Sequence, residues 1–352
     1  MSNVEIKIYG GSHEEVIGVS IIGIPKGAKI DDDAIKEMLR RRGASSSPWS
    51  TPRKEKDEVI FRSGVQDGIA TGEPIVAEII NENVRPSDYA EVLNVPRPSH
   101  ADYVSYYKYG KIFTGGGKFS GRLTAPLCIA GAIIKSLLKD EGITLGAYVS
   151  SIGKINGKSY KDEVISLEEI EIAHKEPLPT LTNAQAMVDE VLESKRNLDS
   201  VGGTVECIVY GLPIGLGDNL TSGMESSIAY EVYGVPGVKG VEFGDGFNLA
   251  SSYGSLANDA YVVEDDKITL ASNKSGGING GITNGMPLTL KVALRPTPSI
   301  AKEQDSVNLI TKEPTKISVK GRHDSCIVPR AVAAIESAVA IAIYKKLIEQ
   351  GK

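Results

Sequence analysis

The chain has little of what marks several large classes of protein. Cysteine is scarce: Cys128, Cys207 and Cys326 are an odd number, lie far apart and form no CxxC pair, which argues for a reducing compartment and against zinc. Aromatic residues make up only 6% of the sequence and the net charge is −6, so a general affinity for nucleic acid is not expected. No apolar run approaches the roughly 20 residues that span a bilayer, and the N-terminus lacks a signal-peptide pattern. These absences predict a cytoplasmic protein with no membrane segment and no nucleic-acid partner.

Glycine and arginine are present in informative positions. The 38 glycines among 352 residues occur in clusters, which is typical of structured turns and ligand-binding loops. Arg40, Arg41 and Arg42 are consecutive, and many further cations lie in loops that contain glycine or proline. An acidic protein that concentrates cations in loops is suited to a small ligand with several negative charges. For any single arginine, a solvated surface charge is the alternative.

The stretch from Arg97 to Arg122 combines these features. It contains RPSHAD, several tyrosines and the sequence GGGKFSGR. Glycine lets a backbone approach a ligand closely, and exposed N–H groups with flanking cations suit a phosphate. The segment is not a Walker A loop, because Ile112 stands where the first glycine is needed and Phe119 where a serine or threonine is needed. It therefore predicts an anion-binding loop of a less common kind.

Hydrophobic periodicity predicts both strands and helices along the chain. The expected strands are 4–9, 15–24, 58–62, 75–80, 204–210, 288–294 and 317–320, with a hairpin over 259–271. The expected helices are 31–42, 123–139, 184–195 and 328–349. Residues 143–200 give an ambiguous pattern and are expected to be peripheral.

A faint internal repeat divides the single domain of residues 1–352. GVQDGIATGEP at 64–74 aligns without gaps with GINGGITNGMP at 277–287, and GIPKG at 23–27 resembles GLPIG at 211–215. Because the two matches occur in the same order, they predict a pseudo-twofold core with halves at about 1–140 and 200–352. Each match is short, so a coincidence between glycine turns is the alternative.

Three of the four histidines lie in similar loops. His13, His100 and His323 stand beside glycine, serine or arginine, whereas His174 lies in a plain polar segment and is expected at the surface. Histidine transfers protons near neutral pH, so the three loops together suggest a shared acid–base site. None of the histidines has the HxH, HExxH or HxxxH spacing of a metal site, and no metal is expected.

Asp324 has two interpretations. It follows His323 and lies near Arg322 and Arg330 in the sequence. It could act as a base, or it could be the ion-pair partner of those arginines. The sequence favours neither.

Eight segments, in order, resemble the signature segments of the chorismate synthase family. They are RPSHAD, KYG, GGGKFSGRLTA, DSVGG, VKGVEFGDGF, GGINGGITNG, RPTPSI and KGRHDSC, and the resemblance extends from His13 to Arg330. It implies a lyase that converts 5-enolpyruvylshikimate 3-phosphate to chorismate by anti-1,4-elimination of phosphate, the last common step of the shikimate pathway in aromatic amino acid biosynthesis. It also implies an α+β fold of layered antiparallel sheets and helices in a pseudo-twofold β-α-β sandwich, assembled as a homotetramer.

The resemblance implies reduced FMN (FMNH2) as cofactor, although the reaction has no net redox change. No separate NADPH domain is evident in the sequence, so NADPH is expected to act only indirectly, through an external flavin reductase. The FMN contacts carried over by motif are Lys118, Phe119, Ser120, Pro236, Gly237, Gly280, Arg295, Pro296, Thr297, Pro298, Ser299 and Arg322.

The resemblance also implies roles for catalytic and substrate-binding residues. His13 would assist the leaving phosphate, His100 would stabilise or protonate the reduced flavin near N1, and Asp324 would take part in removing the substrate proton. Guanidinium groups bind oxyanions bidentately, which suits the phosphate and two carboxylates of the substrate. The candidates for substrate binding are Ser12, Arg42, Arg53, Arg97, Arg122 and Arg330.

The chain departs from the family pattern at several positions. Ser99 and Phe119 replace a usual glycine and serine, Pro48 stands where an arginine is common, and Pro236 replaces an asparagine. Because His13, His100 and Asp324 are retained, activity is expected. The alternatives are a weak relative that only binds an anion, a nucleic-acid-binding module, and a phosphohydrolase that uses histidine and aspartate.

Overall fold

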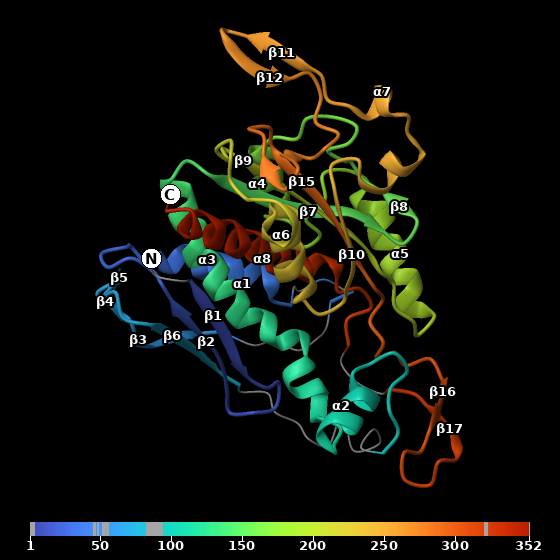
Figure 1. Cartoon of the computed structure of the whole chain (residues 1–352). Helices are drawn as coiled ribbons and strands as arrows, with labels where there is room; N and C mark the ends of the chain where they lie inside the picture. The colour runs from blue at the N-terminus through green and yellow to red at the C-terminus, as the bar shows by residue number, and fades with distance from the viewer. Residues whose placement is uncertain are drawn as a thin grey trace.

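Two antiparallel sheets enclose a layer of helices in the computed structural model (Figure 1). The structure describes residues 4–44, 47, 49–50, 56–81, 94–319 and 323–351. The first sheet has the order β1-β2-β6-β3, formed by Glu5–Gly10, Val16–Ile22, Ile75–Ile80 and Val59–Ser63. The second has the order β10-β15-β9-β7-β8, formed by Val238–Phe243, Leu288–Leu294, Gly203–Tyr210, Thr144–Ile152 and Ile155–Asn156. This arrangement confirms the predicted α+β sandwich.

Four helices form the middle layer. They are α1 (Asp32–Arg42), α3 (Thr124–Asp140), α6 (Met224–Tyr233) and α8 (Val328–Glu349). α3 packs against β2 and β6 of the first sheet, and α8 packs against β7 and β9 of the second. The Asp31 carboxylate caps α1 by accepting two backbone N–H groups, and the three arginines at its C-terminus suit the helix dipole.

The remaining elements lie around this sandwich. The short hairpins are β4–β5 (Val65–Gln66, Ile69–Ala70), β11–β12 (Tyr261–Glu264, Lys267–Leu270), β13–β14 (Ile278–Asn279, Ile282–Thr283) and β16–β17 (Gln304–Val307, Pro314–Ile317). The other α-helices are α2 (Asp102–Tyr109), α4 (Leu167–Ala173), α5 (Ala184–Arg196) and α7 (Gly254–Ala257). The strand expected at 317–320 is wrong at Ser318 and Val319, since β17 ends at Ile317, and Lys320 lies outside the described residues.

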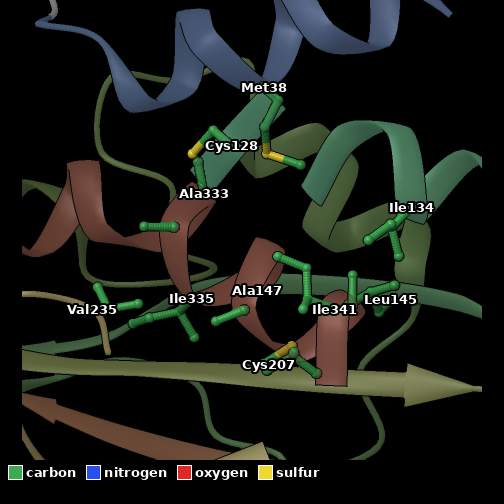
Figure 2. Close-up of a cluster of buried hydrophobic side chains, with 14 of the residues drawn as sticks. Met38, Cys128, Ile134, Leu145, Ala147, Cys207, Val235, Ala333, Ile335 and Ile341 are labelled. Carbon is green, nitrogen blue, oxygen red and sulfur yellow. The ribbon is translucent and has the colours of Figure 1, made fainter. Parts of the chain in front are cut away.

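The core extends from the helix layer to both sheets, and its part at the second sheet is drawn in Figure 2. Met38 of α1, Cys128 of α3, Cys207 of β9 and Ile335 of α8 pack together there (Figure 2). Burial raises the pKa of the Cys128 thiol to about 11. Together with its position inside the core, this makes Cys128 a packing group rather than a nucleophile.

α3 and α8 touch closely at Gly131. A Cβ added to Gly131 would lie 2.2 Å from Ser337 Cβ and 2.6 Å from Ser337 Cα, so no other residue fits without moving a helix. We expect Gly131→Ala to lower the free energy of unfolding by about 1–3 kcal/mol, because overpacking forces the helices apart. Urea denaturation measures this change. Gly254→Ala, where an added Cβ meets nothing within 4 Å, is the control, and equal losses in both variants would contradict the tight contact.

The same arrangement of elements occurs twice. β1, β2, β6 and β3 occupy the positions in the first sheet that β7, β9, β15 and β10 occupy in the second. The two aligned glycine segments form equivalent hairpins, β4–β5 and β13–β14. Four equivalent turn positions in each segment have positive φ, at 64, 67, 68 and 72 and at 277, 280, 281 and 285. The shared glycine pattern thus follows from turns that need left-handed backbone.

The second half begins at β7, not at residue 200, and the expectation that 143–200 is peripheral is wrong for this strand. Residues 145–152 are all buried, because α8 covers one face of β7 and α4 packs near the other. A strand buried on both faces shows no alternation of apolar and polar residues, which explains why the sequence pattern missed it. The insertion after β7 packs α4 against β7, and α5 against β7 and β8.

The expectation that no apolar run approaches the length of a membrane span is wrong for Gly121–Asp140. It is the one helix in the described part of the chain that is long and apolar enough to cross a membrane by length and composition. Of the 18-residue apolar stretch within this helix, 61% is buried inside the protein. α3, which forms most of the helix, packs against α1, α8 and the first sheet. It is therefore a helix of the core.

His174 is buried in an ionic cluster, not at the surface as expected. Its Nε2 lies 2.7 Å from the Ala147 carbonyl oxygen, and Arg41 Nη1 lies 2.9 Å from its Nδ1. Glu336 of α8 is fully buried beside them and pairs with Arg41 at 2.8 Å and Lys135 at 2.5 Å. Burial raises the pKa of Glu336, but the charges of Arg41 and Lys135 outweigh burial and hold that pKa well below its usual range.

Acid should weaken the fold through His174. Burial lowers its pKa, although the Glu336 charge opposes the shift. The unfolded chain, with a histidine pKa of about 6.5, then binds more protons than the folded chain near that pH, so stability falls as the pH drops. We expect urea denaturation to give a smaller loss between about pH 7.5 and 5.5 for His174→Gln than for the native chain. The same loss in both would contradict a buried neutral His174.

Candidate active site

A cavity of about 630 Å³ lies where loops from both halves of the chain meet. Its wall includes residues of the stretches 42–44, 97–101, 115–124, 233–239, 295–299 and 323–331. Among the described residues of this wall, two carboxylates, Asp57 and Asp324, face seven cationic side chains: Arg42, Arg97, Lys118, Arg122, Lys239, Arg295 and Arg330. A protein with a net charge of −6 thus concentrates positive charge in one cavity.

Three of these arginines form a cluster with the two carboxylates. Asp57 accepts from Arg122 Nη1 at 2.5 Å and from Arg42 Nη1 at 3.4 Å. Arg330 donates to Asp324 at 2.5 Å and to the Arg42 carbonyl oxygen at 3.1 Å. Burial, with the like charges of Arg330 and Arg122, lowers the pKa of Arg42 to about 10 despite Asp57. Because these positive charges repel one another, a bound oxyanion would stabilise the cluster.

The triple glycine adopts a backbone that only glycine takes readily. Gly115, Gly116 and Gly117 have φ of 59°, 86° and 51°. A Cβ on Gly115 would lie 2.0 Å from His13 Cε1, and one on Gly116 would lie 3.5 Å from His100 Nε2. The glycines therefore let two histidines from distant parts of the sequence approach one loop.

Ser12 attaches the His13 loop to the triple glycine. Its backbone N–H donates to the Gly117 carbonyl oxygen at 3.2 Å, and its hydroxyl donates to that of Gly115 at 3.1 Å. The same hydroxyl lies 3.0 Å from His13 Nδ1. Neither Ser12 nor His13 is part of the cavity wall. Gly115 is part of the wall, and His13 lies behind it. Ser12 is 1% exposed, so it is placed to orient His13 rather than to touch a substrate.

His100 and Asp324 both line the cavity. His100 Nδ1 lies 2.7 Å from Asp102 Oδ1, and its side chain is 15% exposed. His323 also lines the cavity. For Asp324, the ion pair with Arg330 is present, and its place in the wall is compatible with a role as a base as well.

The structure brings most of the predicted site residues together. Of the predicted cofactor contacts, those in the cavity wall are Lys118, Phe119, Ser120, Pro236, Gly237, Arg295, Pro296, Thr297, Pro298 and Ser299. Of the predicted substrate ligands, Arg42, Arg97, Arg122 and Arg330 are there. Gly280 is not: it lies in the turn of β13–β14, where φ of 61° gives it a conformational role. Arg53, Arg322 and Pro48 lie outside the described residues.

Sequence reasoning missed Asp57, Asp102, Tyr233 and Lys239. Of these four residues, Asp102 could have been found from the sequence, because it follows His100 by two residues within the RPSHAD motif. Asp57 stands just before β3 with no motif around it, and its φ of 50° is unusual for a residue other than glycine. Its ion pairs are with Arg42 and Arg122, which come from α1 and from the segment before α3.

The loop 295–299 contains a polar atom suited to a ligand. Thr297 Oγ1 is buried and has no hydrogen-bond partner among the described residues, although it belongs to the cavity wall. The loop is fixed by Arg295 N–H, which donates to the Gly237 carbonyl oxygen at 2.9 Å, and by the Ser200 hydroxyl, which donates to that of Thr297 at 2.7 Å. Gly237 has φ of 95°, and a Cβ there would lie 2.8 Å from Ile327 Cδ1. A buried unpaired hydroxyl is costly unless a ligand satisfies it.

Comparison with known proteins identifies relatives of this architecture. A family model described as chorismate synthase matches residues 4–348. Chorismate synthase of Lancefieldella parvula is 42% identical, covering 98% of this chain and 95% of the relative, and that of Thermococcus kodakarensis is 40% identical, covering 99% and 96%. A crystal structure of chorismate synthase superimposes with a TM-score of 0.73 at 25% identity, covering 99% of this chain and 92% of the other.

Proposed function

The chain belongs to the chorismate synthase family of lyases, and we propose that it converts 5-enolpyruvylshikimate 3-phosphate to chorismate and phosphate by anti-1,4-elimination with reduced FMN. The cavity with seven cationic side chains carries the proposal. The substrate has a phosphate and two carboxylates, and FMN adds another phosphate. Guanidinium groups neutralise such a set of oxyanions in a way that a neutral pocket cannot.

The residues present fit reduced FMN. The unpaired Thr297 hydroxyl, the fixed loop 295–299 and the Gly237 turn surround a space lined by Lys118 and Ser120, which would hold the cofactor. When bound, reduced FMN would supply electron density to the reacting carbon framework and recover it. NADPH would act only indirectly, through an external flavin reductase.

The side chains divide the chemistry among themselves. Arg122 and Arg330 would bind the anionic groups. Arg42, whose guanidinium donates to Thr124 Oγ1, Asp57 and the Gly121 carbonyl oxygen, would add its positive charge and so help to neutralise the charge that develops on the leaving phosphate. His13, oriented by Ser12, would donate a proton to that phosphate. Asp324, held by Arg330 at 2.5 Å, would take part in accepting the proton that leaves the substrate carbon. His100, which lies beside Gly116 in the cavity wall, would stabilise or protonate the flavin.

Arg122→Ala should mainly weaken substrate binding. Arg122 donates to Asp57 and, through Nε, to Asn81 Oδ1 at 3.2 Å, which aligns its guanidinium at the cavity wall. We expect KM for the substrate to rise by about 10–100-fold, the loss of one charge-assisted contact worth about 1.5–3 kcal/mol. Steady-state kinetics with saturating reduced flavin measure this change. Unchanged KM and kcat would show that Arg122 has a structural role only.

A flavin spectrum tests the proposed ligands directly. We expect the absorbance of reduced FMN to change when 5-enolpyruvylshikimate 3-phosphate is added anaerobically to the chain with bound flavin. No change, with phosphate released in the absence of flavin, would favour a phosphohydrolase. Retarded migration of DNA or RNA at physiological salt would favour a nucleic-acid-binding module instead.

We further propose that the chain assembles as a homotetramer in the cytoplasm. The β11–β12 hairpin projects from the body of the molecule (Figure 1) and exposes Tyr261, Val263 and Ile268 by 76%, 73% and 72%. An isolated two-stranded hairpin is marginally stable in water, so exposed apolar residues on it suit a contact with another copy. Light scattering coupled to size exclusion tests this, and a monomer at micromolar concentration would contradict it.

A further inference from the structure

We propose that Asp102 is a positioning residue that keeps a proton on His100 Nδ1 and presents His100 Nε2 to the cavity, and that Arg97 supports Asp102 rather than binding substrate. The inference rests on the proposed function, because it says which edge of His100 handles protons in that reaction. It also gives Arg97 a different role from the one its motif suggested.

The contact between Asp102 and His100 selects one tautomer. Asp102 Oδ1 lies 2.7 Å from His100 Nδ1, and the Asp102 side chain is 2% exposed. An ionised carboxylate only accepts hydrogen bonds, so a contact of this length requires a proton on Nδ1. Arg97 Nη2 lies 3.1 Å from the same nitrogen, but it also donates to Asp102 Oδ1 at 2.8 Å. A bare Nδ1 would face the carboxylate oxygen lone pair to lone pair.

Arg97 keeps Asp102 ionised and in place. Its Nε donates to Asp102 Oδ2 at 2.7 Å, and its backbone N–H donates to the same oxygen at 3.0 Å. Burial opposes the charge on Asp102, but the hydrogen bonds from Arg97 and His100 outweigh burial and hold the pKa of that carboxyl well below its usual range.

The nitrogens of the Arg97 guanidinium all contact other groups of the protein. Besides Asp102, its Nη1 donates to the Ser299 hydroxyl at 3.0 Å. Arg97 is only 3% exposed, although it forms part of the cavity wall. A substrate clamp needs donors directed at the ligand, whereas these donors point at protein oxygens. The bidentate pair therefore acts as a rigid support behind His100.

The opposite edge of His100 faces the site. A Cβ on Gly116 would lie 3.5 Å from both Nε2 and Cε1, so this edge lies along the triple glycine at the cavity wall. Ser99, with φ of 59°, turns the backbone just before His100, and its carbonyl oxygen accepts from Arg295 Nη1 at 2.8 Å. Asp102 contacts the Nδ1 edge of His100, and the cavity lies at the other edge. Nε2 is therefore the nitrogen that can exchange a proton with a ligand.

The tautomer of His100 can be measured without turnover. The chain has only four histidines, so a sample with ¹⁵N-labelled histidine gives a simple spectrum, and His100→Gln assigns the His100 signals. We expect neutral His100 in the native, full-length chain to carry its proton on Nδ1. A neutral His100 with its proton on Nε2 would overturn the proposal. This result does not depend on whether the chain makes chorismate.

Kinetics of two variants test the supporting role. Asp102→Asn and Arg97→Lys should each lower kcat by about 10–100-fold with little change in KM, the usual cost of losing a group that orients a functional side chain. Asp102→Asn should also remove the Nδ1–H preference from the spectrum. A raised KM with unchanged kcat for Arg97→Lys would show a substrate clamp and overturn the assignment.

Glu206→Gln is the matched control for loss of a buried carboxylate. Glu206 of β9 is fully buried and pairs with Lys291 at 2.7 Å, but it is not part of the cavity wall. We expect it to leave kcat and the His100 signals unchanged. If Asp102→Asn fails to fold, the native spectrum and Arg97→Lys still decide. If no variant or native chain turns over, the spectrum alone decides the positioning role, and the proposed function fails separately.

Discussion

Replacing His13 by alanine should lower kcat by about 10²–10⁴-fold, the usual contribution of a positioned general acid. The physical reason is that departing phosphate carries a developing negative charge. His13, whose Nδ1 lies 3.0 Å from the Ser12 hydroxyl, is the imidazole behind Gly115 of the cavity wall and would donate a proton to that phosphate. The substrate KM should change little, because in this account the arginines would provide the binding energy. Rapid-quench measurement of the chemical step with reduced FMN measures the effect.

His174→Gln is the matched histidine control for this experiment. His174 is buried against Ala147 and Arg41, outside the cavity wall, so its loss should leave kcat near that of the native chain. Near-normal kcat in His13→Ala, with the fold intact by circular dichroism, would reject the general-acid role. A comparable fall in both variants would mean that the loss reflects a disturbed fold.

Gly115→Ala should reduce kcat by about 10²-fold without removing any functional group, since a displacement near 1 Å of a catalytic group costs about that much. The added Cβ would lie 2.0 Å from His13 Cε1, so the imidazole must move away from the cavity. The left-handed φ of 59° adds backbone strain. Steady-state and single-turnover kinetics compare the variant with the native chain.

Gly110→Ala separates the clash from the strain. Gly110 ends α2 with φ of 72°, and a Cβ there would meet nothing within 4 Å. The two variants therefore share a strained backbone, but only Gly115→Ala pushes on His13. Equal losses of kcat in both would contradict the idea that the triple glycine exists to admit the histidines.

Much of the fold could be predicted from local pattern. The helix expected at 328–349 has those bounds, because its sequence is apolar on all sides and Pro329 lies in its first turn. The glycine repeats corresponded to real, equivalent turns, because positive φ limits which residues can stand there. β7 could not be predicted in this way, since its burial on both faces depends on tertiary contacts, with α8, far away in the sequence, and with α4.

The candidate site was predictable where its residues stand in local motifs. His100, Asp324 and the loop 295–299 stand in compact segments, and the structure brings them to one cavity. Asp57 was missed because its ion pairs with Arg42 and Arg122 form only when the chain folds, and no motif in the sequence around it indicates them. His174 was misread for the same reason, since a polar sequence neighbourhood hides an ionic cluster completed by α1, α3 and α8. Burial and ion pairing depend on tertiary contacts that periodicity does not encode.

Turnover under anaerobic conditions tests the central claim most directly. The chain, fully reduced FMN and 5-enolpyruvylshikimate 3-phosphate are mixed, and chorismate and phosphate are quantified together. The account predicts equal amounts of the two products, formed only when reduced flavin is present. Phosphate without chorismate, or no product with fully reduced flavin, would contradict it.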